Sequence, residues 1–161
     1  MNSVAKLVGS PGALRVEELL PHRPPMRFVD TILEVSLEIP LISIVATKRV
    51  VDDELYFKGH YPGRPIVPGA FILEGLAQTG LLLFQLSGRP IQVEEIPVLA
   101  SIEGRFMSPV FPGDVLVYRV EMDKRTELAA IFHGTVHVKH VVVARGEFSF
   151  GVKAWRALKS R

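Results

Sequence analysis

The sequence predicts an α+β fold in which a curved antiparallel sheet wraps around one long apolar helix. Residues 70–86 are apolar on nearly every side, and the length of this stretch fits only a helix. Two β-rich stretches precede the helix and four follow it. A helix that is apolar all round has to be buried, and a sheet curled around it is the simplest way to bury it.

The chain before the central helix predicts a tail, a short helix and two strands. Residues 1–12 end in a Ser-Pro-Gly sequence and are expected to form a flexible tail. Residues 14–20 have helical spacing, and the prolines of segment 21–25 end that helix because proline lacks the amide donor. Residues 27–36 and 41–50 are β-branched and apolar, which predicts an antiparallel pair of strands.

A loop with recurring glycine and proline, residues 59–69, leads into the helix after a polar connection. The loop carries His60, and the helix carries Glu74, which we place in about its first turn. A histidine in a rigid loop and a carboxylate on a buried helix both cost free energy of folding, so a function is the better explanation for them. We interpret them as a general base and a general acid.

The chain after the helix predicts an all-β half. A Ser-Gly-Arg-Pro sequence at 87–90 ends the helix. Alternating or uniformly β-branched stretches predict strands at 97–106, 115–122, 128–138 and 141–150, with turns at 112–114, 123–125 and 139–140. The unpaired edges of such a sheet favour pairing with a second copy.

The length of 161 residues indicates one domain, which we place at residues 13–151, followed by a basic tail at 152–161 with a turn of helix around Trp155 and Leu158. Hydrophobic residues make up 48% of the chain, so we expect much surface to be buried between subunits or around an apolar ligand.

Cysteine is absent, which excludes disulfide and cysteine chemistry and fits a cytoplasmic protein. We find no signal peptide and no segment expected to span a membrane. The net charge of +2 does not indicate nucleic-acid binding.

Several motifs resemble the bacterial 3-hydroxyacyl-[acyl-carrier-protein] dehydratases of the FabZ type. The resemblance extends over nearly the whole chain, and the most specific part of it is GHYPGRPIVPG at 59–69 with an acid five residues later. The other matching motifs are LPHR at 20–23, VD at 29–30, AQ at 77–78 and PVFPGD at 109–114. The resemblance implies the hot-dog fold and a dimer or trimer of dimers, with each active site at a dimer interface. It also implies that no metal or organic cofactor is needed.

The same resemblance implies a role for each candidate residue. His60 would take the proton from C2 of the acyl chain, and Glu74 of the other subunit would donate a proton to the departing C3 hydroxyl. The amide of Gly69 would bind the thioester carbonyl, and Gln78 would support the acid. The predicted oxyanion and substrate-binding residues are thus Gly69, Gln78, Tyr61 and Pro68. The related FabA type usually has aspartate at the acid position, so Glu74 favours dehydration without isomerisation.

These residue types suit the chemistry. An imidazole can accept a proton near neutral pH, and a helix N-terminus stabilises the oxygen on which negative charge develops. Some of these residues also have structural explanations. Gln78 is as well explained by a structural hydrogen bond as by direct participation. His22 and Arg23 are better explained by a tie that holds the N-terminal turn than by the alternative, a place in the wall of the acyl tunnel. A metal site is not expected, because His133 and His137 would lie about 13 Å apart on one strand.

The predicted partner is acidic acyl carrier protein, with Lys58, Arg64, Arg105 and Arg145 as candidate contacts. Neither nucleic acid nor a membrane is expected as a partner. The segments 23–26 and 105–109 depart from the usual FabZ pattern, which leaves docking and chain length open. Two alternatives also stay open: an acyl thioesterase on the same fold, and a non-catalytic acyl-binding subunit that pairs with an active relative.

Overall fold

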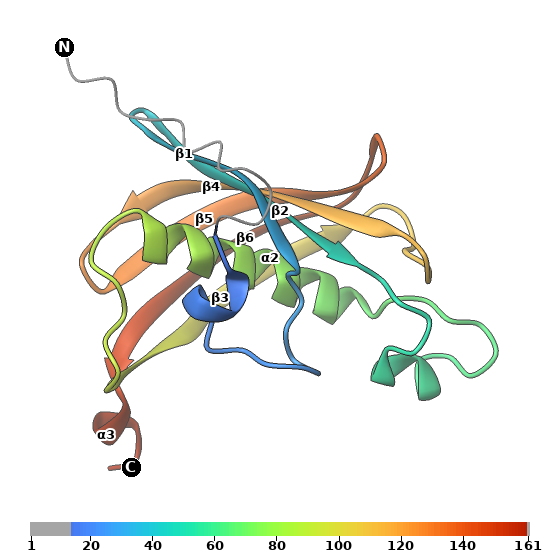
Figure 1. Ribbon diagram of the computed structural model, residues 1–161, viewed down its shortest axis with the longest axis horizontal. Helices are drawn as coiled ribbons and strands as arrows, with labels where there is room; N and C mark the ends of the chain where they lie inside the picture. The colour runs from blue at the N-terminus through green and yellow to red at the C-terminus, as the bar shows by residue number, and fades with distance from the viewer. Residues whose placement is uncertain (1–13, 161) are drawn as a thin grey trace.

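The computed structural model describes residues 14–160, in which six strands surround one long helix (Figure 1). The elements in chain order are α1 (Val16–Leu19), β1 (Thr31–Glu38), β2 (Leu41–Arg49), a 3₁₀ turn η1 (Leu55–Lys58), α2 (Gly69–Leu86), β3 (Glu95–Phe106), β4 (Val115–Arg125), β5 (Ala129–Val138), β6 (Val141–Ala154) and α3 (Trp155–Leu158). The predicted tail at residues 1–12 lies outside the described residues.

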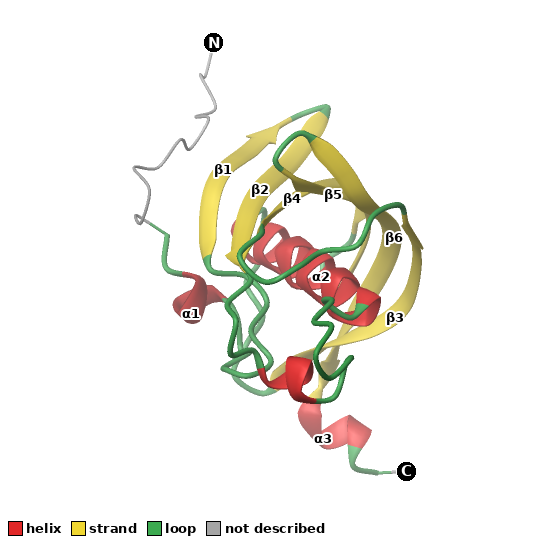
Figure 2. Cartoon of the chain, turned by 90° about the vertical axis from the view of Figure 1, so that its right-hand side faces the viewer, coloured by secondary structure: helices red, strands yellow, loops and turns green. Residues whose placement is uncertain are grey.

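The sheet has the strand order β1-β2-β4-β5-β6-β3, and every neighbouring pair is antiparallel. Figure 2 shows the sheet curving around α2, which lies in its concave face. This arrangement confirms the predicted α+β fold. Strands β1 and β3 form the two edges, because each pairs with one neighbour only among the described strands.

Helix α2 is buried by the sheet on most of its surface. Its fully buried side chains include Leu76, Leu82, Leu83 and Phe84, which join the core formed by the inner face of the strands. We expected no segment to be long enough to span a membrane, and for α2 this expectation was wrong. Among the described residues, α2 is long and apolar enough to cross a bilayer, but 56% of it is buried inside the protein. The concave face of the sheet supplies the apolar environment that this helix needs.

Two glycines let α2 approach the sheet closely. A Cβ atom at Gly75 would overlap the ring and hydroxyl of Tyr118 on β4. A Cβ atom at Gly80 would lie 2.5 and 2.6 Å from two ring carbons of Phe148 on β6. Glycine inside a helix costs about 1 kcal/mol relative to alanine, so these positions exchange helix propensity for close packing. Close approach of the sheet therefore explains both glycines.

We therefore expect the Gly80→Ala substitution to destabilise the protein. Overpacking against the buried ring of Phe148 should outweigh the gain in helix propensity and lower the free energy of unfolding by about 1–2 kcal/mol. Urea denaturation of the variant measures the change. The matched control is Gly59→Ala, where a Cβ atom meets nothing within 4 Å and the free energy should stay within about 0.5 kcal/mol. An unchanged midpoint for Gly80→Ala would contradict the packing argument.

Strand ends differ from the predictions where tertiary contacts intervene. Strand β1 begins at Thr31 and not at residue 27, because the amide of Phe28 donates to the side chain of Gln78 on α2. The predicted turn at 123–125 was wrong. Strand β4 continues to Arg125 through a register shift after Met122, and the turn follows it. Strand β6 continues to Ala154 and leads into the expected helical turn α3.

Arg125 gives a physical reason for the longer strand. Its guanidinium group lies 4.2 Å from the ring centroid of Phe84 and donates to the carbonyl of Arg89 at 3.3 Å. These contacts tie the end of β4 to the end of α2. A charged residue that reads as part of a turn in the sequence is thus held in the sheet by a cation–π contact.

Candidate active site

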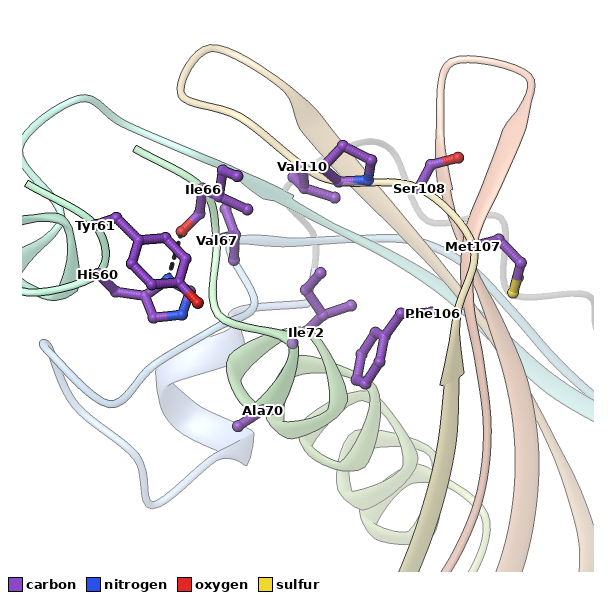
Figure 3. Close-up of a pocket in the computed structure, with 12 residues that line it drawn as sticks. His60, Tyr61, Ile66, Val67, Ala70, Ile72, Phe106, Met107, Ser108 and Val110 are labelled. Atoms are coloured by element: carbon purple, nitrogen blue, oxygen red, sulfur yellow. Dashed lines mark hydrogen bonds between the residues drawn. The ribbon is translucent and has the colours of Figure 1, made fainter. Parts of the chain in front are cut away.

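His60 lies in the loop before α2 and is held by its backbone and its ring. Its amide donates to the carbonyl of Tyr56 at 2.9 Å, and its ring stacks on Tyr61 with the centroids 4.2 Å apart. The Nδ1 atom lies 3.0 Å from the carbonyl oxygen of Ile66 (Figure 3). Because a carbonyl can only accept, Nδ1 carries the proton in this hydrogen bond, and Nε2 keeps its lone pair. The loop thus leaves Nε2 as the nitrogen of the neutral ring that can accept a proton.

A groove of about 590 Å³ opens beside His60 and Tyr61. Its other walls are mostly apolar and come from the loop before α2, the start of α2, the end of β3 and the segment that follows β3: Ile66, Val67, Gly69, Ala70, Ile72, Phe106, Met107, Ser108, Pro109 and Val110. In Figure 3 the start of α2 lies between His60 on one side and Phe106 on the other. An apolar groove with a few polar groups is typical of a small-molecule site.

Gly69 is the first residue of α2, and its amide faces no acceptor within the helix because the first N–H groups of any helix lack one. A Cβ atom at Gly69 would lie 2.7 Å from the ring of Phe106, so glycine allows this ring to close on the end of the helix. The preceding Pro68 is the N-cap residue and accepts from the amide of Phe71 at 3.0 Å. Its side chain does not line the groove.

Glu74 lies in the second turn of α2, one turn later than predicted. The helix dipole therefore acts on it less strongly than on a first-turn residue. Its Oε1 atom accepts a hydrogen bond from Nε2 of Gln78 at 2.8 Å. Gln78 is 1% exposed, and its amide also joins the carbonyl of Met26 and the amide of Phe28, each at 2.8 Å. The buried glutamine thus fixes the carboxylate to the helix and to the segment before β1.

A second cavity, of about 70 Å³, lies beside Glu74. Its other lining residues are His22, Ala77, Gln78, Leu81, Pro97, Leu99 and Phe150, most of them apolar. After Gln78, His22 is the polar lining residue that approaches the carboxylate, with its Nε2 atom 3.6 Å from Oε1 of Glu74. The sequence could not assign this contact, because 52 residues separate His22 from Glu74 and no periodic pattern links them. The LPHR motif was the one signal that could have pointed to it.

His60 and Glu74 do not line the same cavity within one chain. The edge strand β3 borders both cavities: Phe106, at its C-terminal end, lines the groove at His60, and Pro97 and Leu99, toward its N-terminal end, line the cavity at Glu74. Most of β3 is exposed, including apolar side chains such as Leu99 (44%) and Phe106 (49%). A long edge strand with exposed apolar residues is typical of an interface.

The histidines on β5 are held by other groups. The Nδ1 atom of His133 lies 2.8 Å from Asp123, and its Nε2 atom lies 3.3 Å from Glu121. The hydrogen bond and charge of Asp123 raise the pKa of His133. His137 is bonded to Thr135 at 2.9 Å. No group of three or more potential metal-ligating side chains is found within residues 14–160.

The sequence of the chain is similar to a known domain family and to known dehydratases. Residues 20–147 match the model of the FabA-like domain family. The chain is 42% identical over 135 residues to the 3-hydroxyacyl-[acyl-carrier-protein] dehydratase FabZ of Anaeromyxobacter dehalogenans strain 2CP-C, and the match covers 83% of this chain and 85% of the relative. It is 40% identical to the FabZ of Xanthomonas euvesicatoria pv. vesicatoria, over 83% and 87% of the two chains.

A solved structure shows the same fold. The dehydratase heterocomplex ApeI:P from Xenorhabdus doucetiae contains a chain that superposes with a TM-score of 0.75, covering 92% of this chain and 99% of that one. The sequence identity is 18%, so this likeness bears on the fold alone.

Proposed function

The chain belongs to the family of FabA-like domains, and on that premise we propose that it dehydrates (3R)-3-hydroxyacyl-[acyl-carrier-protein] to the trans-2-enoyl thioester, in fatty-acid or a related lipid or polyene biosynthesis. It is thus a lyase. The names of its relatives support this activity over the thioesterase and non-catalytic alternatives. The substrate is carried by acyl carrier protein, and the cytoplasmic location stays a prediction.

The proposed mechanism assigns one proton transfer to each side chain. His60 removes a proton from C2 through Nε2, which the bond from Nδ1 to the carbonyl of Ile66 leaves free. The C–H electrons form the C2–C3 double bond while the C3–O bond breaks. Glu74 gives its proton to the departing hydroxyl, which leaves as water. Transient negative charge on the thioester oxygen is stabilised by the amide of Gly69 at the N-terminus of α2.

The observation that carries this proposal is the placement of the two groups at opposite ends of β3. If β3 pairs antiparallel with β3 of a second copy about a twofold axis, the Phe106 end of one strand meets the Leu99 end of the other. The His60 groove of one subunit then lies against the Glu74 cavity of its partner. We therefore propose a homodimer with two shared sites, which three dimers could extend to a hexamer.

Activity of the purified protein alone tests the function. With a (3R)-3-hydroxyacyl carrier protein as substrate, we expect an increase in ultraviolet absorbance from the conjugated enoyl thioester and no release of free thiol. The absorbance separates the dehydratase from a thioesterase, which would release thiol. Turnover without a second kind of subunit separates it from a non-catalytic subunit. Thiol release, or no turnover with any chain length, would refute the proposal.

A further inference from the structure

We propose that His22 is a positioning residue for the acid: with Gln78 it fixes Oε1 of Glu74, so that Oε2 presents the acidic proton to the substrate. This inference rests on the proposed function of Glu74. It concerns a residue for which the sequence alone favoured a structural tie. Three features of the site carry it: the contacts of the carboxylate, the environment of the imidazole, and the shape of the cavity.

The contacts of Glu74 distinguish its two oxygens. Oε1 accepts from Nε2 of Gln78 at 2.8 Å and faces Nε2 of His22 at 3.6 Å. Within residues 14–160, Oε2 takes part in no hydrogen bond. An acid that hands over a proton needs one oxygen held by the protein and the other turned to the substrate. The distance to His22 exceeds a hydrogen bond, and contacts of this kind tighten when substrate fills a site.

The environment of His22 fixes which nitrogen carries the proton. Its Nδ1 atom is buried and has no hydrogen-bond partner among residues 14–160. An N–H group is rarely left unpaired in a buried position, so we assign the proton of the neutral ring to Nε2, which faces Glu74. Burial lowers the pKa of His22, the charge of Glu74 opposes this shift, and Arg23 adds to it. The ring is therefore a neutral donor at neutral pH.

The geometry gives this donor a task in the reaction. As Glu74 releases its proton, negative charge develops on the carboxylate, and Nε2 of Gln78 and Nε2 of His22 lie 2.8 and 3.6 Å from Oε1 to stabilise it. The rest of the small cavity is apolar, so Gln78 and His22 are the polar side chains of its lining that can donate to the carboxylate. The backbone of His22 is itself held, because Nη1 of Arg23 donates to the carbonyls of Leu20 and His22 at 2.7 and 2.9 Å.

Two substitutions at one position test the inference. His22→Leu removes the donor, and we expect kcat to fall about 10- to 100-fold, the effect of losing a hydrogen bond to a charged group, with KM within about twofold. His22→Gln is the matched control, because its amide can reach the place of Nε2 and donate without becoming charged. We expect it to restore most of kcat. Thermal unfolding of both variants separates loss of function from loss of fold.

A double-mutant cycle shows whether His22 acts through Glu74. In a Glu74→Gln background, His22→Leu should have almost no further effect on the residual rate. The inference is overturned if His22→Leu keeps the wild-type kcat, if its effect multiplies with that of Glu74→Gln, or if Gln rescues no better than Leu. Failure of the proposed function looks different, since the wild type would not turn over or Glu74→Gln would be fully active. That result would overturn the inference as well.

Discussion

Replacement of His60 by alanine is expected to lower kcat by about 10²- to 10⁴-fold, the usual contribution of a positioned general base. The C2 proton of a thioester is too weakly acidic to leave unaided. Nδ1 of His60 is bound to the carbonyl of Ile66, so the ring nitrogen left free at the apolar groove is Nε2. Steady-state turnover of hydroxyacyl carrier protein, followed by enoyl absorbance, measures the loss.

The control for this prediction is His140→Ala, in the exposed turn between β5 and β6, which should leave the rate unchanged. The unfolding temperature of His60→Ala should also stay near that of the wild type, because the His60 side chain lies outside the main core. A His60→Ala variant that is folded and retains its activity would remove His60 from the mechanism.

Two inactive variants are expected to recover activity when they form one dimer. In a heterodimer of His60→Ala and Glu74→Gln, a shared site that takes each residue from a different subunit is intact at one of the two positions. Chains co-expressed with different affinity tags and purified through both should therefore show about half of the wild-type activity per dimer. The physical reason is the position of β3, whose opposite ends border the two cavities.

The complementation experiment has a clear opposite outcome. If His60 and Glu74 of the same chain acted together, each site of the heterodimer would lack one of them, and no activity would return. The matched control joins His60→Ala with a chain that carries both substitutions. This heterodimer has no intact site under either arrangement and should stay inactive.

Much of the fold could be predicted because local patterns were strong. The apolar stretch at 70–86 allowed only a buried helix, and α2 begins one residue earlier, at Gly69. The turn at Lys139 and His140 formed although it lacks the preferred glycine, with Lys139 at φ 55°. The turn expected at 123–125 did not form, because the contact of Arg125 with Phe84 lies outside any local pattern.

In the candidate site, too, local patterns predicted some contacts, and others depend on segments that are far apart in the chain. The loop motif and the spacing of Glu74 and Gln78 could be read directly, since residues four apart on a helix are neighbours and the structure joins them at 2.8 Å. The neighbourhood of His22 and the role of Phe106 at Gly69 could not be read, because each depends on segments far apart in the chain. Whether His60 and Glu74 act together across two subunits stays a prediction.

By itself, the sequence determined the buried helix, the number of strands and the residue types of the chemistry, because these depend on hydrophobic period and on short motifs. Only the tertiary structure decided that the groove of His60 and the cavity of Glu74 lie apart, that β3 is left as an edge, and that His22 faces the carboxylate. The physical reason is that strand order and the curvature of the sheet bring distant segments together, and neither is encoded in any local stretch of the chain.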